Sequence, residues 1–402
     1  MVLALIIVAA KLGGELLGRL GQPPVLGELL VGVLLGNLPL FGITVLEPLR
    51  DSSMLRVVAE IGAILLLFEV GVESDLFQLL AVGWSSLVVA MLGVLAPMIL
   101  GYVVSWQLLP DTSWLTHLFV GGTLTATSVG ITARVLKDLG KANSKEAQII
   151  LGAGITDDVI GLVVMAVVSG LVTAASGGGG GVSPGSVLWI VVKASVFLIL
   201  AVVVGRFWSQ RIFVHAAKLQ VPGVLLGLCL CFCFVVAAIS GFVGLAPIVG
   251  AFAAGIVLEE VHYQPFRERG ERKVEELLFP ITTLIVPVFF VMMGFRVDVK
   301  SFASPAVLGF AALITLVAIV GKQICGLGVL ERGLDRLAIG VGMIPRGEVG
   351  LIFAGIGATL TLAGKPVLSP TTFSALVLMI MLTTFITPPL LKLAFERKRS
   401  RS

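Results

Sequence analysis

The chain has few charged residues. Lysine, arginine, aspartate and glutamate together make up 13% of its 402 residues, whereas an ordinary soluble domain carries about 25%. Hydrophobic residues make up 57% of the chain, and the mean hydropathy is +1.08. This composition excludes a soluble globular protein and indicates an all-α polytopic membrane protein in a lipid bilayer. The net charge of +4 does not point to a nucleic-acid partner, because the basic residues lie mostly in the predicted loops.

Cysteine is scarce as well. The four cysteines are Cys229, Cys231, Cys233 and Cys325, and all lie inside apolar runs. Such positions favour small side chains facing the core or the lipid over disulfides or metal ligands. No cleavable signal is expected, because Met1 runs directly into an apolar segment without a basic region before it. No cofactor is expected either.

Apolar segments of membrane-spanning length predict about thirteen transmembrane helices. They fall at 2–20, 25–41, 54–72, 82–108, 114–135, 147–173, 186–208, 222–240, 243–258, 277–295, 305–330, 335–362 and 371–394. With the amino terminus outside, nineteen of the 28 lysines and arginines fall in inside loops or the tail, and five in outside loops. The positive-inside rule therefore predicts a cytoplasmic carboxyl terminus, with a basic tail at 395–402.

The two halves of the chain resemble each other. Pro-Val-Leu-Gly at 24–27 matches Pro-Ile-Val-Gly at 247–250, an offset of 223 that also relates Gly32 to Gly255 and Gly71 to Gly294. Further on, Ser-Val-Gly-Ile at 128–131 matches Glu-Val-Gly-Leu at 348–351, an offset of 220. We predict two six-helix repeats, 1–175 and 222–394, joined by a linker helix with its flanking loops at 176–221. Because one linker crossing separates them, the repeats are inverted, which suits alternating access at a site near the midplane.

Two adjacent carboxylates, Asp157 and Asp158, lie in the middle of the apolar segment 147–173. A charge at the centre of a membrane helix costs at least ~2.5–3.5 kcal/mol, so the pair needs a counter-charge, a proton or a bound cation. Neighbours on a helix point about 100° apart. One carboxylate can therefore meet a counter-charge while the other faces water and substrate. We interpret the pair as the ion site of a transporter.

Lys322 is a candidate for that counter-charge. It lies about half-way along the segment 305–330, where a lysine cannot easily extend to the membrane surface and needs an acidic partner. Asp157 and Asp158 are both candidates.

Two segments carry the composition of broken helices. Residues 121–130 combine glycines with clustered hydroxyls that include Thr127 and Ser128, and residues 343–350 are interrupted by Pro345. Broken helices at this depth line cavities. If the two breaks cross, they bring together half-helix ends with like partial charges of about half a unit. Glu348 could neutralise amino-terminal ends and Arg346 carboxyl-terminal ends. Alternatively, Arg346 and Glu348 cap an ordinary loop, and the two hydroxyls bond back to their own helix.

These residues together resemble the cation/proton antiporter-2 family, in particular its NapA-type sodium/proton antiporters. The resemblance covers nearly the whole chain. It rests on Leu-Leu-Phe-Glu-Val-Gly-Val-Glu-Ser-Asp at 66–75, Thr-Ser-Val-Gly-Ile at 127–131, Thr-Asp-Asp at 156–158, Lys322, and Arg-Gly-Glu at 346–348.

The resemblance implies a thirteen-helix homodimer. A dimer domain would surround the two-fold axis, and a core domain with two crossed broken helices would move as an elevator. Asp158 would bind sodium or protons, and Asp157 would pair with Lys322. Family members selective for potassium often carry Gln at the first acidic position, where this chain has Asp157. Kef-type potassium systems also carry a cytoplasmic nucleotide-binding domain after the last helix, which is not expected here.

We therefore predict a secondary transporter, not an enzyme, that exchanges sodium, with lithium as a second candidate, for protons. Oxygen atoms of Asp158, Asp157 and Thr127 would hold the transported cation, with Ser128 nearby. Exchange would be electrogenic if sodium displaces Lys322 and the lysine loses a proton. The expected location is a bacterial inner membrane, and the expected roles are pH homeostasis and sodium tolerance. The alternatives are potassium/proton exchange at the same site, an intramembrane aspartyl protease, and an ion sensor or channel that does not exchange.

Overall fold

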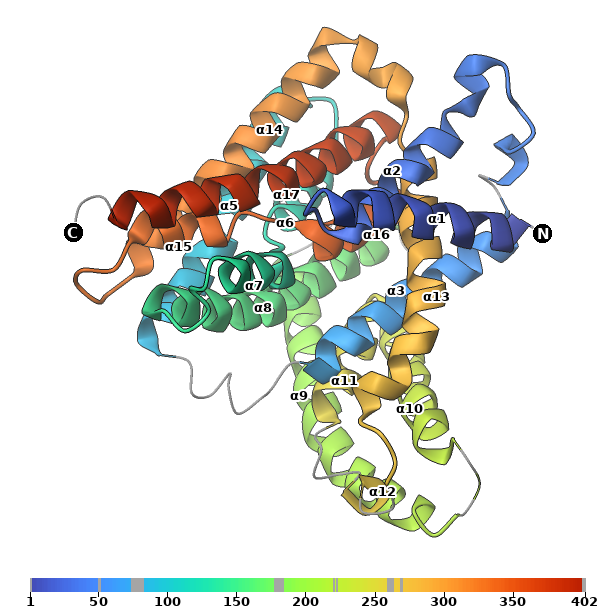
Figure 1. The fold of residues 1–402 in the computed structure, drawn as a ribbon. Helices are drawn as coiled ribbons and strands as arrows, with labels where there is room; N and C mark the ends of the chain where they lie inside the picture. The colour runs from blue at the N-terminus through green and yellow to red at the C-terminus, as the bar shows by residue number, and fades with distance from the viewer. Residues whose placement is uncertain are drawn as a thin grey trace.

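The computed structural model describes residues 2–49, 52–73, 83–176, 184–219, 221, 223–258, 264–267 and 270–399, and most of them are helical (Figure 1). The α-helices are α1 (Val2–Arg19), α2 (Pro24–Gly36), α3 (Ser53–Glu73), α5 (Trp84–Leu108), α6 (Trp114–Thr123), α7 (Val129–Asp138), α8 (Lys145–Ser176), α9 (Pro184–Ala216), α10 (Val224–Phe242), α11 (Pro247–Val257), α12 (Gln264–Arg267), α13 (Val274–Phe295), α14 (Pro305–Gln323), α15 (Arg336–Gly342), α16 (Gly347–Thr359) and α17 (Pro370–Arg399). Short 3-10 turns are η1 (Leu38–Phe41), η2 (Glu47–Leu49), η4 (Val299–Ala303) and η5 (Ile324–Gly328).

Each of the thirteen predicted segments contains one α-helix or two consecutive ones. Among the described residues, seven helices are long and apolar enough to cross a membrane, or eight if α15 and α16, which are bent by 49°, count as one span. The fold is therefore a polytopic helical one, as predicted. The count of thirteen crossings stays a prediction, since α2 and α11 have only 13 and 11 residues.

Several helix boundaries follow from local sequence. Proline occupies the first turn of α2, α11 and α14, where its missing N–H removes no intrahelical hydrogen bond. Ser113 caps α6 by accepting a hydrogen bond from the amide of Leu115, and Asp335 caps α15 in the same way. These caps satisfy amides that the first turn of a helix leaves without partners.

The segment 335–362 departs from the all-α prediction at its end. Helix α16 stops at Thr359, and β1 (Thr361–Leu362) pairs antiparallel with β2 (Lys365–Pro366). The turn between them holds Ala363 at φ 50° and Gly364 at φ 78°. Because glycine adopts positive φ without steric cost, the chain reverses here instead of continuing the helix to residue 362.

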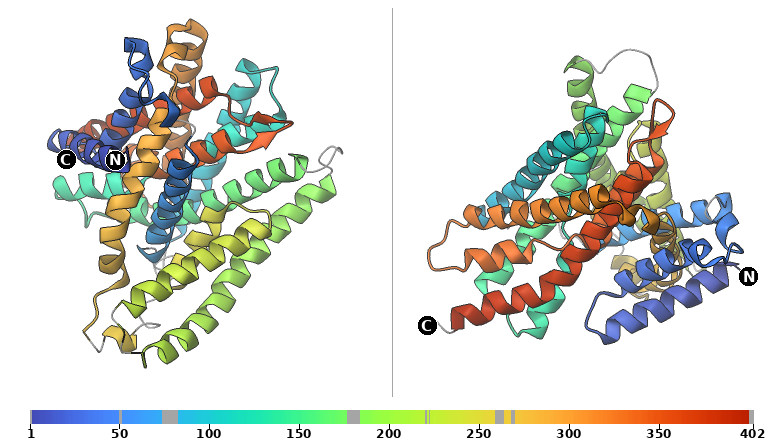
Figure 2. Two further views of the ribbon diagram at one scale, coloured as in Figure 1. Left: turned by 90° about the vertical axis from the view of Figure 1, so that its right-hand side faces the viewer. Right: turned by 90° about the horizontal axis from the view of Figure 1, so that it is seen from above.

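The helices pack as two groups (Figure 1). The first group contains α1, α2, α3, α10, α11 and α13, and the second contains α5, α6, α7, α8, α14, α15, α16 and α17. Helix α9 contacts α11 of the first group and α8 of the second. The start of α1 and the end of α17 lie on opposite sides of the bundle (Figure 1; Figure 2, right). The second group carries the predicted site residues.

Glycines bring helix backbones of the first group into direct contact. A Cβ atom on Gly32 of α2 would lie 2.9 Å from the Cα of Gly294 on α13, and one on Gly71 of α3 would lie 3.0 Å from the Cα of Gly255 on α11. Gly32 matches Gly255 in the predicted repeat, and Gly294 matches Gly71. The same crossing thus occurs twice with the halves exchanged, which supports the proposed duplication.

Candidate functional site

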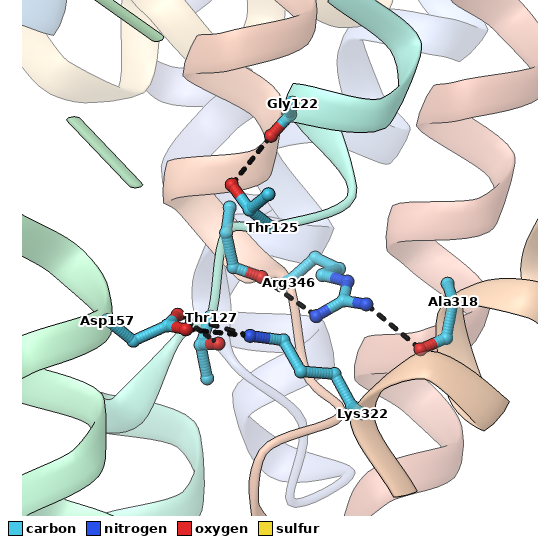
Figure 3. Close-up of polar contacts among 8 residues, drawn as sticks. Gly122, Thr125, Thr127, Asp157, Ala318, Lys322 and Arg346 are labelled. Atoms are coloured by element: carbon cyan, nitrogen blue, oxygen red, sulfur yellow. Dashed lines mark hydrogen bonds and ion pairs between the residues drawn. The ribbon is translucent and has the colours of Figure 1, made fainter. Parts of the chain in front are cut away.

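Asp157 of α8 forms a buried ion pair with Lys322 of α14 (Figure 3). The Lys322 Nζ atom lies 3.0 Å from Oδ1 and 3.2 Å from Oδ2 of Asp157, and both side chains are 0% exposed. The Thr127 hydroxyl donates a 2.6 Å hydrogen bond to Oδ2 of the same carboxylate. Helix α8, helix α14 and the segment between α6 and α7 therefore meet at one buried carboxylate. Of the two acidic candidates for Lys322, the structure pairs it with Asp157.

Gly93 of α5 makes room for this pair. A Cβ atom at Gly93 would lie 3.1 Å from Oδ1 of Asp157 and 3.3 Å from Nζ of Lys322. Any side chain here would press against the ion pair. Sequence reasoning missed Gly93, because it is one of many glycines in the chain and has no charged residue near it in sequence.

Asp158 has different surroundings from its neighbour. Its side chain is half-buried, and it makes no hydrogen bond or ion pair to any residue in the part of the chain that the structure describes. Asp157 and Glu348 are its negatively charged neighbours, and Lys322 is its positively charged one. This is the division that the 100° step predicts: one carboxylate is held by a counter-charge, and the other is left available.

The two broken helices meet beside these carboxylates. The chain leaves α6 at Thr123 and enters α7 at Val129, and it leaves α15 at Gly342 and enters α16 at Gly347. The amide of Ser128 donates a 2.7 Å hydrogen bond to the carbonyl of Pro345, which joins the two breaks directly.

Arg346 is fully buried at this junction and donates to one backbone carbonyl in the first break and to another within α14. Its Nη1 lies 2.9 Å from the carbonyl oxygen of Ala126, and its Nη2 lies 3.0 Å from that of Ala318 on α14 (Figure 3). The Ala126 carbonyl follows the carboxyl end of α6, where a positive charge is favourable beside the partial negative charge of the helix end. The compensating role of Arg346 stays a prediction.

Glu348 occupies the opposite kind of position, in the first turn of α16. The Ser128 hydroxyl lies 3.0 Å from both of its carboxylate oxygens. An acidic side chain is stabilised at a helix amino terminus by the macrodipole. Ser128 was predicted with the ion-binding set, and the structure places its hydroxyl against Glu348 and not against either aspartate.

The hydroxyls at the break between α6 and α7 form two kinds of hydrogen bond. Thr123 and Thr125 donate back to the carbonyls of Phe119 and Gly122, at 2.9 and 2.7 Å. Thr127 and Ser128 instead donate to the carboxylates of other helices. The alternative in which Thr127 and Ser128 bond back to their own helix is therefore not what the structure has.

Two further acidic residues, Glu69 and Glu73, lie in the last turns of α3. Glu73, at the exposed end of α3, is influenced electrostatically by Glu275 of α13 and by Glu348. One turn earlier, Glu69 accepts a 3.3 Å hydrogen bond from the hydroxyl of Thr282. In the predicted topology this end faces the cytoplasm, so cations approaching the site from that side would meet negative charge.

A bundle of apolar helices that holds a paired charge and an available carboxylate beside two broken helices defines a membrane transporter of ions. The chain matches the transmembrane sodium/hydrogen exchanger family over residues 2–396. The protein belongs to this family, whose members are transporters and not enzymes. The predicted resemblance to cation/proton antiporters is confirmed.

Individual relatives agree over nearly their whole length. The high-affinity Na+/H+ antiporter NhaS3 of Synechocystis sp. is 38% identical to this chain, with 98% of this chain and 89% of that protein aligned. The Na+/H+-K+ antiporter GerN of Bacillus cereus is 34% identical, with 98% and 96% aligned. The solved structure of the sodium proton antiporter MjNhaP1 of Methanocaldococcus jannaschii has the same fold, with a TM-score of 0.69 over 96% of this chain and 94% of that one at 18% identity.

Proposed function

We propose that the protein exchanges sodium ions for protons across a membrane. The observation that carries this proposal is the contrast within the aspartate pair. Asp157 is already held by Lys322 and Thr127, whereas Asp158 is half-buried and has no bonded partner among the described residues. A partly exposed carboxylate in a membrane needs a proton or a cation. The relatives NhaS3 and GerN, both named Na+/H+ antiporters, support sodium and protons as the two competitors.

In this proposal Asp158 is the exchanging group. Sodium would be held by oxygen atoms of Asp158, with Asp157 and Thr127 completing the set. Binding a proton on Asp158 removes the charge that attracts the cation, so the two substrates exclude each other. This competition lets one site couple the two ion flows.

Lys322 would make the exchange electrogenic. If sodium takes over the Oδ atoms of Asp157, the ammonium group loses its only ion-pair partner among the described residues. A buried lysine without a counter-charge favours its neutral form. Release of that proton, in addition to the one from Asp158, would move two protons for each sodium ion.

Alternating access would come from movement of the second helix group against the first. A cavity of about 410 Å³ lies between them, lined by α3 and α13 on one side and by α8 and α16 on the other. The repeats at 1–175 and 222–394 and the linker at 176–221 supply the inverted symmetry that such movement needs. We propose an elevator in which the first group is the scaffold.

The same proposal includes a homodimer in a bacterial inner membrane, with the amino terminus outside and the carboxyl terminus cytoplasmic. Potassium is the alternative cation, because GerN is named a Na+/H+-K+ antiporter. The acid at position 157, where potassium-selective family members often carry Gln, favours sodium; lithium is expected to share its site.

Reconstitution into proteoliposomes with a pH-sensitive dye tests the function. Sodium, lithium and potassium are added separately, with and without an imposed voltage. Sodium should move protons in the wild type and not in Asp158→Asn, whereas Asp138→Asn at the exposed end of α7 should match the wild type. Cation-independent pH traces from the wild type, or full activity of Asp158→Asn, would overturn the proposal.

A further inference from the structure

The junction of the broken helices shows a local symmetry that extends to α17. Two of its contacts join residues 220 positions apart: the Ser128 hydroxyl with Glu348, and the Arg346 guanidinium with the carbonyl of Ala126. This separation equals the offset of the predicted repeat at 128–131. Each residue thus touches its own counterpart, as expected where a pseudo-two-fold axis passes between two copies of one motif.

On this offset Thr127 corresponds to Gly347, and each makes one hydrogen bond to the next long helix in its own half of the chain. Thr127 donates its hydroxyl to Asp157 on α8, which follows α7. Gly347 donates its backbone amide to the Thr384 hydroxyl on α17, which follows α16, at 3.2 Å. Asp157 and Thr384 are both buried, at 1% and 0% exposed. Thr384 thus accepts on α17 the kind of contact that Asp157 accepts on α8, with a neutral oxygen in place of a carboxylate. The two residues lie 227 positions apart and not 220, so they correspond by contact and not by the sequence offset.

The amide that Thr384 accepts from is one that the helix itself leaves unsatisfied. Gly347 is the first residue of α16, and the residue before it, Arg346, gives no side-chain cap. A buried amide without an acceptor is unfavourable. Gly347 also has a left-handed φ of 46°, and a Cβ atom there would lie 2.5 Å from Cβ of Ser128. The first turn of α16 thus has a crowded, left-handed backbone, and its amide needs a hydrogen-bond acceptor from another helix.

The side chain of the next residue, Glu348, is the one that faces Ser128 and acts electrostatically on Asp158. The direction of that carboxylate depends on how the first turn of α16 is held. We propose that Thr384 is a positioning residue for the cation site: its hydroxyl anchors the amide of Gly347 and so keeps Glu348 directed at the site. This inference rests on the proposed sodium/proton exchange.

The neighbouring threonines of α17 supply a matched control. Thr387 is also 0% exposed, but its hydroxyl donates to the carbonyl of Thr383 within its own helix, at 2.6 Å. Replacing it by valine removes a buried hydroxyl of the same kind without touching α16. An effect specific to Thr384 therefore separates positioning from a general loss of packing in α17.

The test compares Thr384→Val, Thr384→Ser and Thr387→Val in proteoliposomes, with proton movement recorded against sodium concentration. Thr384→Val should raise the KM for sodium by about fivefold, the factor that corresponds to one lost hydrogen bond, with the maximal rate within about twofold of wild type. Thr384→Ser, which keeps the hydroxyl, and Thr387→Val should both keep the wild-type KM. If Thr384→Val does not reconstitute, Thr384→Ala makes the same comparison.

An unchanged KM in Thr384→Val, an equal rise in Thr387→Val, or no restoration in Thr384→Ser would overturn the inference. The wild type measured in the same vesicles separates the two proposals. A wild type without sodium-driven proton movement would overturn the proposed function itself, whereas an active wild type with an unaffected Thr384→Val would overturn only the role of Thr384.

Discussion

Asp157 and Asp158 are adjacent on α8, but their side chains lie on two sides of the helix with opposite environments. On the side of Asp157, Lys322 and Thr127 supply partners at 2.6 to 3.2 Å, and solvent reaches none of the paired groups. On the side of Asp158, the carboxylate is half-buried. Asp157, Glu348 and Lys322 act on it through their charges, without a hydrogen bond or ion pair among the described residues. We call these the closed side and the open side. The difference teaches that a membrane protein can hold one charge permanently and leave the adjacent one for exchange.

Lys322→Ala should break the closed side with the largest effect on stability. It leaves Asp157 as a buried charge without an ionic partner, and such losses cost about 3–5 kcal/mol. Thermal unfolding in detergent measures the change. The double variant Asp157→Asn with Lys322→Ala should recover part of the loss, because it removes the orphaned charge. A single variant as stable as wild type would show that the two sides do not differ in this way.

Thr127→Val should have the next largest effect. It removes the 2.6 Å hydrogen bond to Asp157, and hydrogen bonds to charged groups contribute about 1.5–3 kcal/mol. Thr125→Val is the matched control, since that hydroxyl bonds back to the carbonyl of Gly122 and to no other group in the described part of the chain. We expect Thr127→Val to lower the unfolding temperature further than Thr125→Val. Equal shifts would mean that Thr127 contributes nothing particular to the closed side.

Gly93→Ala tests how tightly the closed side is packed. The added methyl group would lie 3.1 Å from Oδ1 of Asp157, and overpacking of this kind costs about 1–3 kcal/mol. Gly130→Ala on α7, whose Cβ would meet nothing within 4 Å, should leave stability unchanged or raise it slightly. Unfolding temperatures of the two variants decide between these outcomes, and a fully tolerated Gly93→Ala would contradict a close fit.

Glu348→Gln addresses the open side and should change stability least. The amide keeps an acceptor for the Ser128 hydroxyl, so the free energy of unfolding should stay within about 0.5 kcal/mol of wild type. Loss of a negative charge next to Asp158 should instead weaken sodium binding, seen as a smaller sodium-dependent rise in unfolding temperature. A large loss of stability with unchanged sodium response would reverse the assignment of the two sides.

The helical segments could be predicted because apolar length and loop charge act locally in sequence. The depth of Asp157 and Asp158 followed from the same reasoning, as did the need of Lys322 for an acid. The choice of Asp157 over Asp158 could not be made from the residues alone, because either side of α8 could face α14. The resemblance to known antiporters supplied that choice.

Other features depend on contacts that no local pattern records. Gly93 acquires its role from the ion pair that packs against it, and Thr384 from an amide of another helix. Ser128 was grouped with Thr127 because they are adjacent and similar, yet their hydroxyls bond to different acids. The small hairpin after α16 depends on a turn conformation at Ala363 and Gly364 that hydropathy does not detect.

The glycine crossings of the first helix group limit how that group can deform. At Gly32 and at Gly255 the neighbouring backbone comes so close that an added Cβ atom would lie 2.2 and 2.3 Å from a carbonyl oxygen. No side chain lies between the helices to change rotamer and absorb a displacement. A slip along either crossing would bring larger residues against those carbonyls. The four helices joined there should consequently keep one fixed spacing throughout the transport cycle, and hydrogen exchange of their amides should be among the slowest in the protein.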